Sequence, residues 1–247
     1  MNLVLIEPSE LDAEHRAVLG GTRAGHLITV LRIAVGGSVR VGVIDGGIGT
    51  AIATRIEAGR VTLRCSLGEV PARPRIDLLL ALPRPKVLGR LYAPLAQLGI
   101  GRLILSNAAR VERFYFDAHQ LDPAFRRAQL LDGLAQARDT RVPVVSVHKS
   151  LRVLIEDELD ALTPNTRRLL ADPGAPLGVR DACAELAPSE RILIAIGPEG
   201  GWNEFERELL RAHGFTAIGL GPRTLRSDVA TIALLAVASD AIASRSA

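Results

Sequence analysis

From residue 76 onward, short apolar runs alternate with longer stretches of helical periodicity. Residues 76–82 and 191–196 are almost continuously apolar, which is typical of strands covered on both faces. Further strands are predicted at 102–105, 142–147, 167–171 and 215–220. Helices are predicted at 86–98, 123–137, 150–159, 179–186, 203–213 and 229–243. Such alternation predicts an α/β domain built on a mostly parallel sheet.

The first seventy residues have a different pattern. Residues 38–44 and 50–56 alternate between apolar and polar side chains, and the glycine-rich segment 45–49 between them suits a hairpin turn. A third strand is predicted at 60–67. The proline-rich segment 71–75 then separates two kinds of sequence. We therefore expect a small β-rich domain over 1–70, a linker over 71–75 and an α/β domain over 76–247.

The charge is unevenly distributed along the chain. Residues 71–150 carry thirteen basic and six acidic side chains, whereas residues 151–247 carry ten and fourteen. A basic central segment suits a polyanion such as a nucleic acid. Only Lys86 and Lys149 among the basic residues are lysines. Arginine can donate two hydrogen bonds to one phosphate, so the preference for arginine over lysine suits such a partner. The composition of the genome explains the same preference equally well.

Several classes of protein are disfavoured. The sequence contains no run of 18 apolar residues, so no membrane span is predicted. The first residues lack the pattern of a secretion signal. Cys65 and Cys183 are too few for a disulfide scaffold or a cysteine-based zinc site, and the histidines lack metal-ligand spacing. We expect a cytoplasmic protein that uses neither a membrane nor a metal.

Two loops rich in glycine and proline follow predicted strands near the C-terminus. The strand 191–196 runs into Gly197–Gly201, and the strand 215–220 runs into a loop that begins at Gly221. Open α/β sheets bind ligands at the carboxyl ends of their strands, although glycines at such places also serve simply as turns. Neither loop has the spacing of a dinucleotide or nucleoside-triphosphate fingerprint, which disfavours a nucleotide-dependent oxidoreductase. Trp202 is expected to cover a ligand or to pack at an interface.

The residues of the two loops resemble a known family. Gly197-Pro198-Glu199-Gly200-Gly201 and Leu220-Gly221-Pro222-Arg223-Thr224-Leu225-Arg226 are similar to loops of the RsmE family. Its members are SPOUT-class methyltransferases that methylate N3 of a uridine in 16S rRNA. The likeness extends to His26 with Val30-Leu31-Arg32 and to Leu82-Pro83-Arg84-Pro85-Lys86.

The resemblance implies a fold and a reaction. It implies a PUA-like N-terminal β-barrel that binds RNA, followed by a SPOUT domain with a trefoil knot. It implies S-adenosylmethionine as cofactor, 16S rRNA or the small ribosomal subunit as partner, and a homodimer with the cofactor in the cleft of the knotted loops.

The resemblance also assigns residues by position. The expected cofactor-binding residues are Leu82, Pro83, Ile196, Gly197, Pro198, Glu199, Gly200, Gly201, Leu220, Gly221, Leu225 and Arg226. The expected RNA-binding residues are His26, Arg32, Arg84, Lys86, Arg110, Arg113, Arg138, Arg141 and Arg223. Arg226 is the first catalytic candidate, because an arginine beside the base stabilises the imide anion. Asp228 is a second candidate, either as proton acceptor or, with equal weight, as a cap of the last helix.

The sequence departs from the family at places where RNA would be read. Arg226-Ser227-Asp228-Val229 stands where the family usually has Arg-Thr-Glu-Thr, and Ala135 and Asp139 stand where it has a glutamate and an arginine. Two alternatives therefore remain: a SPOUT methyltransferase for another RNA position, and a noncatalytic RNA-binding or ribosome-assembly factor. The cluster Phe114-Tyr115-Phe116 suits either stacking on bases or packing in a core or dimer interface.

Overall fold

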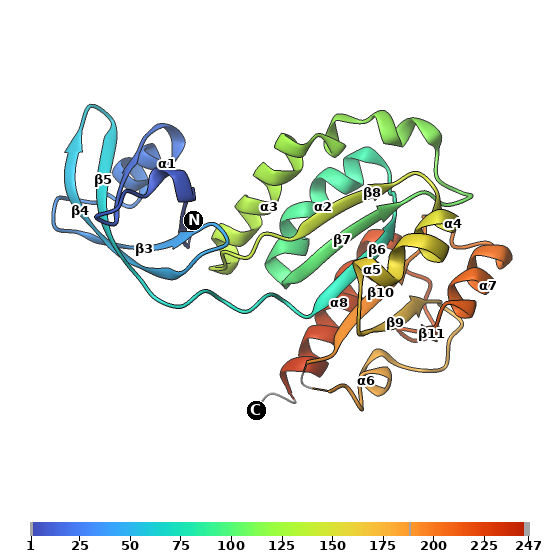
Figure 1. The fold of residues 1–247 in the computed structure, drawn as a ribbon. Helices are drawn as coiled ribbons and strands as arrows, with labels where there is room; N and C mark the ends of the chain where they lie inside the picture. The colour runs from blue at the N-terminus through green and yellow to red at the C-terminus, as the bar shows by residue number, and fades with distance from the viewer. Residues whose placement is uncertain (1, 188, 245–247) are drawn as a thin grey trace. The chain divides into compact units, whose positions relative to one another are not determined.

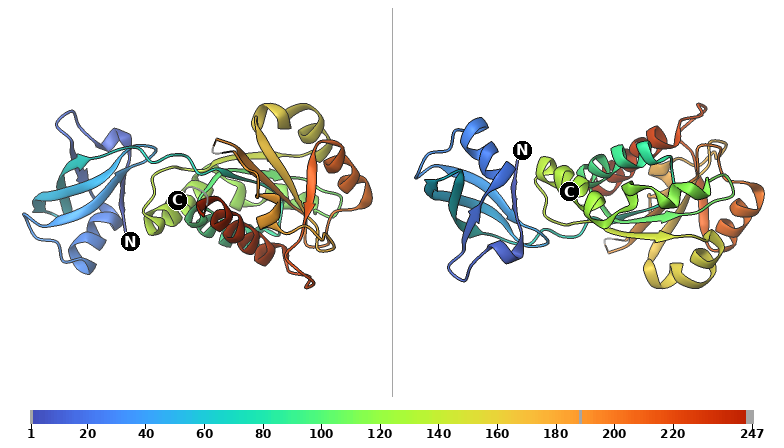
Figure 2. Two further views of the ribbon diagram at one scale, coloured as in Figure 1. Left: turned by 90° about the horizontal axis from the view of Figure 1, so that it is seen from below. Right: turned by 90° about the horizontal axis from the view of Figure 1, so that it is seen from above.

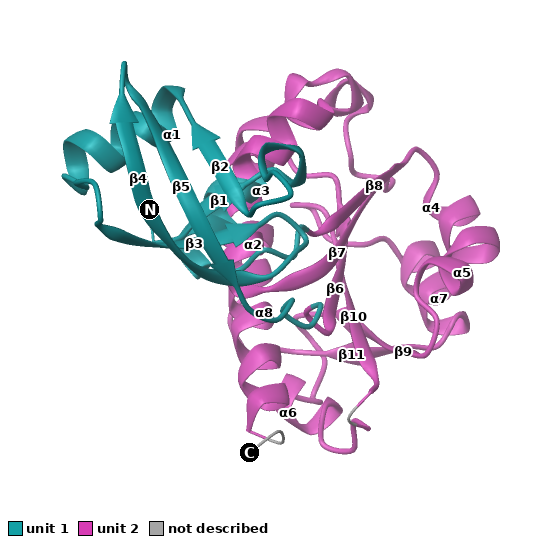
Figure 3. Ribbon diagram, turned by 60° about the vertical axis from the view of Figure 1, so that its left-hand side comes forward, with its two compact units in different colours: residues 1–73, 130–142 teal, residues 74–129, 143–247 magenta. Residues whose placement is uncertain are grey.

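The computed structural model describes residues 2–187 and 189–244, which form two compact units (Figure 3). The first unit consists of residues 1–73 with residues 130–142, and the second of residues 74–129 with residues 143–247. The predicted division assigned residues 130–142 to the second domain, and that part of it is wrong. The Ala135 carbonyl accepts hydrogen bonds from the backbone N–H groups of Asn2 and Leu3, and the Thr140 hydroxyl donates to the Gly46 carbonyl at 2.6 Å. These bonds join the segment to the N-terminal strands.

The first unit is built on a five-stranded sheet (Figure 1). Its strands are β1 (Val4–Ile6), β2 (Arg16–Leu19), β3 (Ser38–Val43), β4 (Ile48–Glu57) and β5 (Arg60–Leu67), in the order β1-β3-β4-β5-β2. The pairs β3–β4 and β4–β5 are antiparallel, which confirms the three predicted strands and the turn after β3. Alternate residues of β5, Val61, Leu63 and Cys65, are buried in the core of this unit. The sequence did not predict β1, β2 or the short helix α1 (Gly21–Gly25).

The second unit contains a six-stranded sheet in which every neighbouring pair is parallel. Its strands are β6 (Ile76–Ala81), β7 (Ile100–Ser106), β8 (Val144–His148), β9 (Thr166–Ala171), β10 (Arg191–Ile196) and β11 (Phe215–Ile218). They lie in the order β11-β9-β10-β6-β7-β8. All six residues of β6 are buried, as expected for a strand covered on both faces. The prediction of an α/β fold with a mostly parallel sheet is confirmed.

Helices cover both faces of this sheet. They are α2 (Pro85–Leu98), α4 (Leu151–Val153), α5 (Leu159–Leu162), α6 (Val179–Ala182), α7 (Glu204–Ala212) and α8 (Ser227–Ala243). A further helix, α3 (Pro123–Ala137), begins in the second unit and ends in the first. Figure 2 shows α8 on one face of the sheet and α4 with α5 on the other. Two of these helices have clear end signals. Gly99 caps α2 with a φ of 77°, and Asn203 forms a capping box with Glu206 at the start of α7.

The apolar helix α8 packs against α2 and against the strands β6 and β10. Leu234, Leu235 and Ala238 of α8 are buried, because so apolar a helix is stable only when it is packed against other elements. Val229, in its first turn, is 49% exposed. The helix therefore buries one side within this unit and presents apolar side chains at its start.

Candidate functional site

Three loops of the second unit meet at one edge of its sheet. Strand β9 lies between β10 and β11, and because the three strands are parallel, their carboxyl ends lie at the same edge. The loops that follow enclose a cavity of about 310 Å³, here called the glycine-loop cavity. Its lining residues are Ala171, Asp172, Pro173, Ile196, Gly197, Pro198, Glu199, Gly200, Gly201, Trp202, Arg207, Ile218, Gly219, Leu220, Gly221, Arg223, Thr224, Leu225, Ser227 and Ala230.

Most residues that the resemblance assigned to cofactor binding line this cavity. They are Ile196, Gly197, Pro198, Glu199, Gly200, Gly201, Leu220, Gly221 and Leu225. Leu82, Pro83 and Arg226 are not among its lining residues. Leu82 is buried, and its backbone N–H donates to the Ser106 carbonyl at 2.8 Å, next to the paired ends of β6 and β7. The structure thus brings the two loops together without these three side chains.

The third loop, which follows β9, was not predicted from the sequence to be part of a site. Ala171, Asp172 and Pro173 line the cavity, although only their strand was predicted. The signal was present, because Asp172-Pro173-Gly174 is turn-forming sequence directly after an apolar strand. The rule that ligands bind at the carboxyl ends of strands applies to this loop as it does to the other two.

Trp202 closes one side of the glycine-loop cavity. Its side chain is 4% exposed and packs against Gly197, where a Cβ atom would lie 3.0 Å from the indole ring. Glycine at position 197 therefore allows the ring to approach the loop. The indole Nε1 is buried and has no hydrogen-bond partner among the residues that the structure describes. Buried donors are normally paired, so this N–H is available to an acceptor on a bound molecule.

The first glycine-rich loop is held from outside by residues 109–110. Glu206 is 4% exposed, and its carboxylate accepts from the Ala109 backbone N–H at 2.6 Å and from the Asn203 backbone N–H at 2.9 Å. Arg110 donates to the Gly200 carbonyl and, at 3.5 Å, to the Gly201 carbonyl. Arg110 is one of the residues predicted to bind RNA, and its exposed guanidinium also contacts this loop.

A second cavity, of about 720 Å³, is lined by residues from α2, from a 3-10 turn at 113–117 and from both glycine-rich loops. We call it the basic cavity. Its lining residues are Arg84, Pro85, Lys86, Val87, Arg90, Phe114, Tyr115, Glu199 and Arg226. It combines Arg84 and Lys86, predicted to bind RNA, with Arg226, predicted to be catalytic. Glu199 lines both cavities, so the two adjoin.

Asp228 lies in the first turn of α8 and lines neither cavity. Its Oδ1 accepts from the Val229 backbone N–H at 3.0 Å, and its Oδ2 lies 3.4 Å from Arg226. The carboxylate thus contacts the beginning of the helix and the candidate catalytic arginine. The N-cap position of α8 is held by Arg226, so Asp228 adds negative charge to the first turn without being the N-cap residue.

The other residues predicted to bind RNA are divided between the two units. In the second unit, Arg113 and Arg223 are both exposed, and Arg223 also lines the glycine-loop cavity. In the first unit, Arg32 and Arg138 are exposed and have positive φ angles of 49° and 61°. The side chains of the remaining two residues, Arg141 and His26, are less accessible to a ligand. Arg141 donates to the Asp45 carbonyl at 3.1 Å, and the Nε2 atom of His26 is buried.

Two sequence departures lie near the end of α3 in the first unit, and one of them, Asp139, acts through its side chain. The Ala135 carbonyl pairs with the N-terminus, as described above. The Asp139 carboxylate accepts from the backbone N–H groups of Thr140 at 2.6 Å and Arg141 at 3.0 Å. Asp139 therefore fixes the turn that carries Thr140 onto the loop between β3 and β4.

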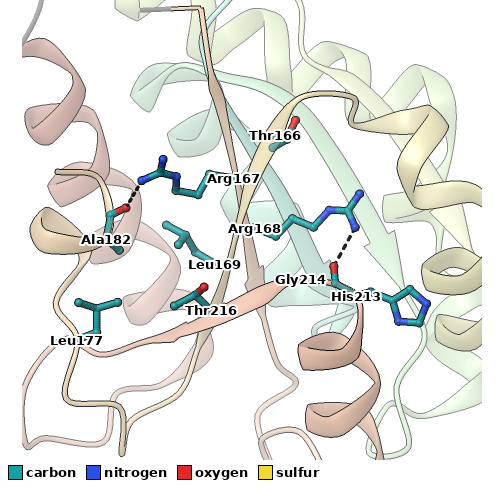
Figure 4. A pocket seen from close by; sticks show the side chains of 9 residues that line it. All are labelled: Thr166, Arg167, Arg168, Leu169, Leu177, Ala182, His213, Gly214 and Thr216. Atoms are coloured by element: carbon teal, nitrogen blue, oxygen red, sulfur yellow. Dashed lines mark hydrogen bonds between the residues drawn. The ribbon is translucent and has the colours of Figure 1, made fainter. Parts of the chain in front are cut away.

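A further cavity, of about 440 Å³, lies at the amino ends of β9 and β11 (Figure 4). Arg167 and Arg168 point to opposite sides of β9 there. Arg167 donates to the Ala182 carbonyl at 3.0 Å and pairs with Glu190, whereas Arg168 donates to the His213 carbonyl at 2.9 Å. These arginines hold neighbouring segments on the sheet, so we assign this cavity a structural role.

Neither a metal-binding cluster nor a membrane-spanning helix occurs among the described residues. No group of three or more His, Cys, Asp or Glu side chains that could hold a metal ion occurs within residues 2–187 and 189–244. None of the helices in this part of the chain is long and apolar enough to cross a membrane.

Known proteins resemble the chain over nearly its whole length. Residues 71–239 match the RNA methyltransferase domain family. The ribosomal RNA small subunit methyltransferase E of Treponema pallidum (strain Nichols) is 32% identical over 96% of this chain and 90% of its own length. The protein of that name from Mycobacterium tuberculosis is 29% identical over 90% of this chain and 85% of its own length.

A solved structure shows the same fold. The ribosomal RNA small subunit methyltransferase E of Neisseria gonorrhoeae, crystallised with S-adenosyl methionine, superposes with a TM-score of 0.75. The two chains are 21% identical, and the match covers 96% of each. Together with the family match and the relative from Treponema pallidum, this places the chain in a family: it belongs to the ribosomal RNA small subunit methyltransferase E proteins.

Proposed function

We propose that this chain transfers a methyl group from S-adenosylmethionine to N3 of a uridine in 16S rRNA, in the cytoplasm. The observation that carries the proposal is the adjoining pair of cavities at the carboxyl edge of the sheet, in a chain of this family. One cavity is built of glycine-rich backbone and apolar side chains, and the other presents four cationic side chains to an anionic partner.

The glycine-loop cavity fits the cofactor. The glycine backbones of its loops allow close approach of a flat ring, and the unpaired Nε1 of Trp202 offers a donor to a ring nitrogen or carboxylate. Asp172 and Arg207 also line it and offer one acceptor and one donor to the amino-acid part of the cofactor. When bound, S-adenosylmethionine supplies an electrophilic methyl group on a sulfonium.

The chain's own residues then have two tasks, to orient the base and to stabilise its charge. Removing the N3 proton of a uridine leaves a negative imide, whose charge an arginine can stabilise in the transition state. Arg226 lines the basic cavity and is the residue that we assign to this task. Orientation of the base against the methyl group supplies the rest of the acceleration.

The finer architecture is part of the same proposal. The close packing of α8 on β6 and β10, although it follows the edge strand β11 in sequence, supports a trefoil knot in the second unit. The exposed Val229 and half-buried Ile232 of α8 support a homodimer contact through this helix. The five-stranded first unit supports a PUA-like RNA-binding barrel.

The test is methyl transfer from labelled S-adenosylmethionine to small ribosomal subunits and to naked 16S rRNA, both lacking the native modification. We expect label to be recovered as 3-methyluridine. Label in another nucleoside or in another RNA would favour a methyltransferase of different target. If S-adenosylmethionine bound without any transfer, the 16S rRNA assignment would be wrong, and if it did not bind, a noncatalytic RNA-binding role would be favoured.

Cofactor binding can be followed through Trp202, the single tryptophan of the chain. Because the indole is buried and lines the glycine-loop cavity, titration with S-adenosylmethionine is expected to change its emission saturably. Trp202→Phe is expected to weaken binding by about fivefold to tenfold in calorimetry, because it removes one hydrogen-bond donor and keeps a ring. Binding seen by calorimetry with no change in emission would place the cofactor elsewhere.

A further inference from the structure

The basic cavity has an exposed aromatic ring as well as cations. Phe114 is 64% exposed, which is unusual for so large an apolar side chain. Its ring meets Tyr115 edge to face, with the ring centroids 4.8 Å apart and an interplanar angle of 84°. This contact supports the ring while leaving most of it open. Exposed aromatic faces in basic grooves are the surfaces on which unpaired bases stack.

The charges around the cavity suit a nucleotide. Arg84, Lys86 and Arg90 come from the start of α2, and Arg226 comes from the loop before α8. Glu199 is the single carboxylate among the described residues that line it. The 14-residue helix α2 also directs its N-terminus to this side, which adds positive potential for a phosphate.

Glu199 has a distinct position among these cations. Its Oε2 lies 2.7 Å from the Nε of Arg84, and both Glu199 and Arg226 line the cavity. The group therefore offers donors on two arginines and an acceptor on one carboxylate. The pairing edge of uracil has the complementary groups, with carbonyl acceptors O4 and O2 on either side of the N3–H donor. Cytosine has a donor amino group in place of O4 and no proton on N3.

We propose that the basic cavity receives the target base unstacked from its neighbours, with Phe114 as the stacking surface and Glu199 as the acceptor of the N3–H. The inference rests on the proposed function and adds the selection of uracil to it. Because Glu199 also lines the glycine-loop cavity, a base held this way directs N3 toward the methyl donor. In the transfer, the N3–H bond breaks and its proton passes to the Glu199 carboxylate. The N3 electron pair forms the bond to the methyl carbon, and the sulfur keeps the electrons of the broken S–CH₃ bond.

The first test concerns stacking. Phe114→Ala is expected to lower the methyl-transfer rate at subsaturating RNA by about 5-fold to 150-fold, the range measured for lost base stacking. Phe114→Tyr should restore the rate, and Phe114→Leu should not, since leucine is apolar but has no ring. The matched control is Phe205→Ala on α7, because Phe205 is 58% exposed and lines neither cavity. S-adenosylmethionine affinity, followed by Trp202 emission, should be unchanged in all four variants.

The second test concerns the proton. Glu199→Gln keeps the size of the side chain but removes its basicity, and we expect a loss of about 100-fold or more in the single-turnover rate at neutral pH. The loss should shrink as the pH rises toward ionisation of the imide itself, because the base then needs no acceptor. A residue that only shaped the site would show the same loss at every pH. The charged groups that share the two cavities with Glu199 are Arg84, Lys86, Arg90, Asp172, Arg207, Arg223 and Arg226.

The outcomes separate this inference from the proposed function. Wild-type protein that forms no methylated uridine would overturn the proposed function, and the inference with it. Active wild type with an equally active Phe114→Ala variant would overturn the stacking site alone. A Glu199→Gln variant whose defect is independent of pH would overturn the role of Glu199 as proton acceptor.

Discussion

Arg226→Ala is expected to lower the methyl-transfer rate by about 100-fold or more while S-adenosylmethionine affinity changes little. The magnitude is that of removing one donor that stabilises developing negative charge. We expect the rate to change without the cofactor affinity because Arg226 lines the basic cavity and does not line the glycine-loop cavity. Its side chain is 71% exposed, so its loss should cost the fold less than about 0.5 kcal/mol. Single-turnover transfer and calorimetry on the same preparation measure both quantities.

The matched control is Arg180→Ala. Arg180 is 69% exposed and pairs with Asp240 of α8, much as Arg226 pairs with Asp228, but it lines neither cavity. Its substitution should leave transfer and cofactor binding as in the wild type. Equal losses of rate and of cofactor affinity in Arg226→Ala would move Arg226 from catalysis to cofactor binding. An unchanged rate would exclude it from the reaction.

Elements with strong local signals were predicted well. The strand β10 and the helix α3 have the predicted bounds, and β5 matches the predicted third strand of the N-terminal segment. Each has either a continuous apolar run, alternation or helical periodicity, which few residues suffice to establish. The capping box of Asn203 with Glu206 is equally local, because it depends on side chains three residues apart. The short strands β1 and β2, which contain three and four residues, were not predicted, because so few residues establish no alternation.

The order of the strands in the sheet could not be predicted from one sequence. Nothing local in residues 166–171 indicates that β9 lies between β10 and β11, yet that position brings the Asp172 loop to the site. The assignment of residues 130–142 to the first unit depends likewise on bonds between residues about 90 to 130 apart. Long-range partners of this kind leave no periodic pattern.

The candidate site was predicted in part for the same reason. The two glycine-rich loops were found because each is compact in sequence and follows an apolar strand. The contact of Arg110 with the carbonyls of Gly200 and Gly201 could not be predicted, because these residues lie about 90 residues further along the chain. In the sequence, only its charge within a basic segment was visible. The adjoining position of Phe114 and Arg226 likewise required the fold.

Arg191→Ala is expected to destabilise the second unit by about 3 kcal/mol. Asp77, on β6, is 2% exposed, and its carboxylate is paired with Arg191 on the neighbouring strand β10. The pair is bidentate, with Nε–Oδ2 at 3.1 Å and Nη2–Oδ1 at 2.6 Å. Removing the arginine leaves a buried carboxylate without its counter-charge, which typically costs about 3–5 kcal/mol. The lower end applies because the Arg191 side chain is 27% exposed, so water can reach the site. Thermal unfolding should shift down by roughly 6 to 12 °C.

The neighbouring strand makes room for this pair. A Cβ atom on Gly101 of β7 would lie 2.3 Å from Nη2 of Arg191 and 3.0 Å from Oδ1 of Asp77. Glycine at 101 is thus a condition of the ion pair, and Gly101→Ala should also destabilise the unit.

We attribute the lower stability of Arg191→Ala to the buried carboxylate that it leaves without a counter-charge. A double variant tests this explanation. Asp77→Ala added to Arg191→Ala removes the stranded carboxylate, so the double variant should be more stable than Arg191→Ala alone. The control is Arg152→Ala, which breaks the exposed pair with Glu156 and should change stability by less than about 1 kcal/mol. If the double variant were less stable than Arg191→Ala alone, the loss of stability would come from missing packing volume rather than from an unpaired charge. The two side chains would then stabilise β6 and β10 chiefly by filling space between the strands.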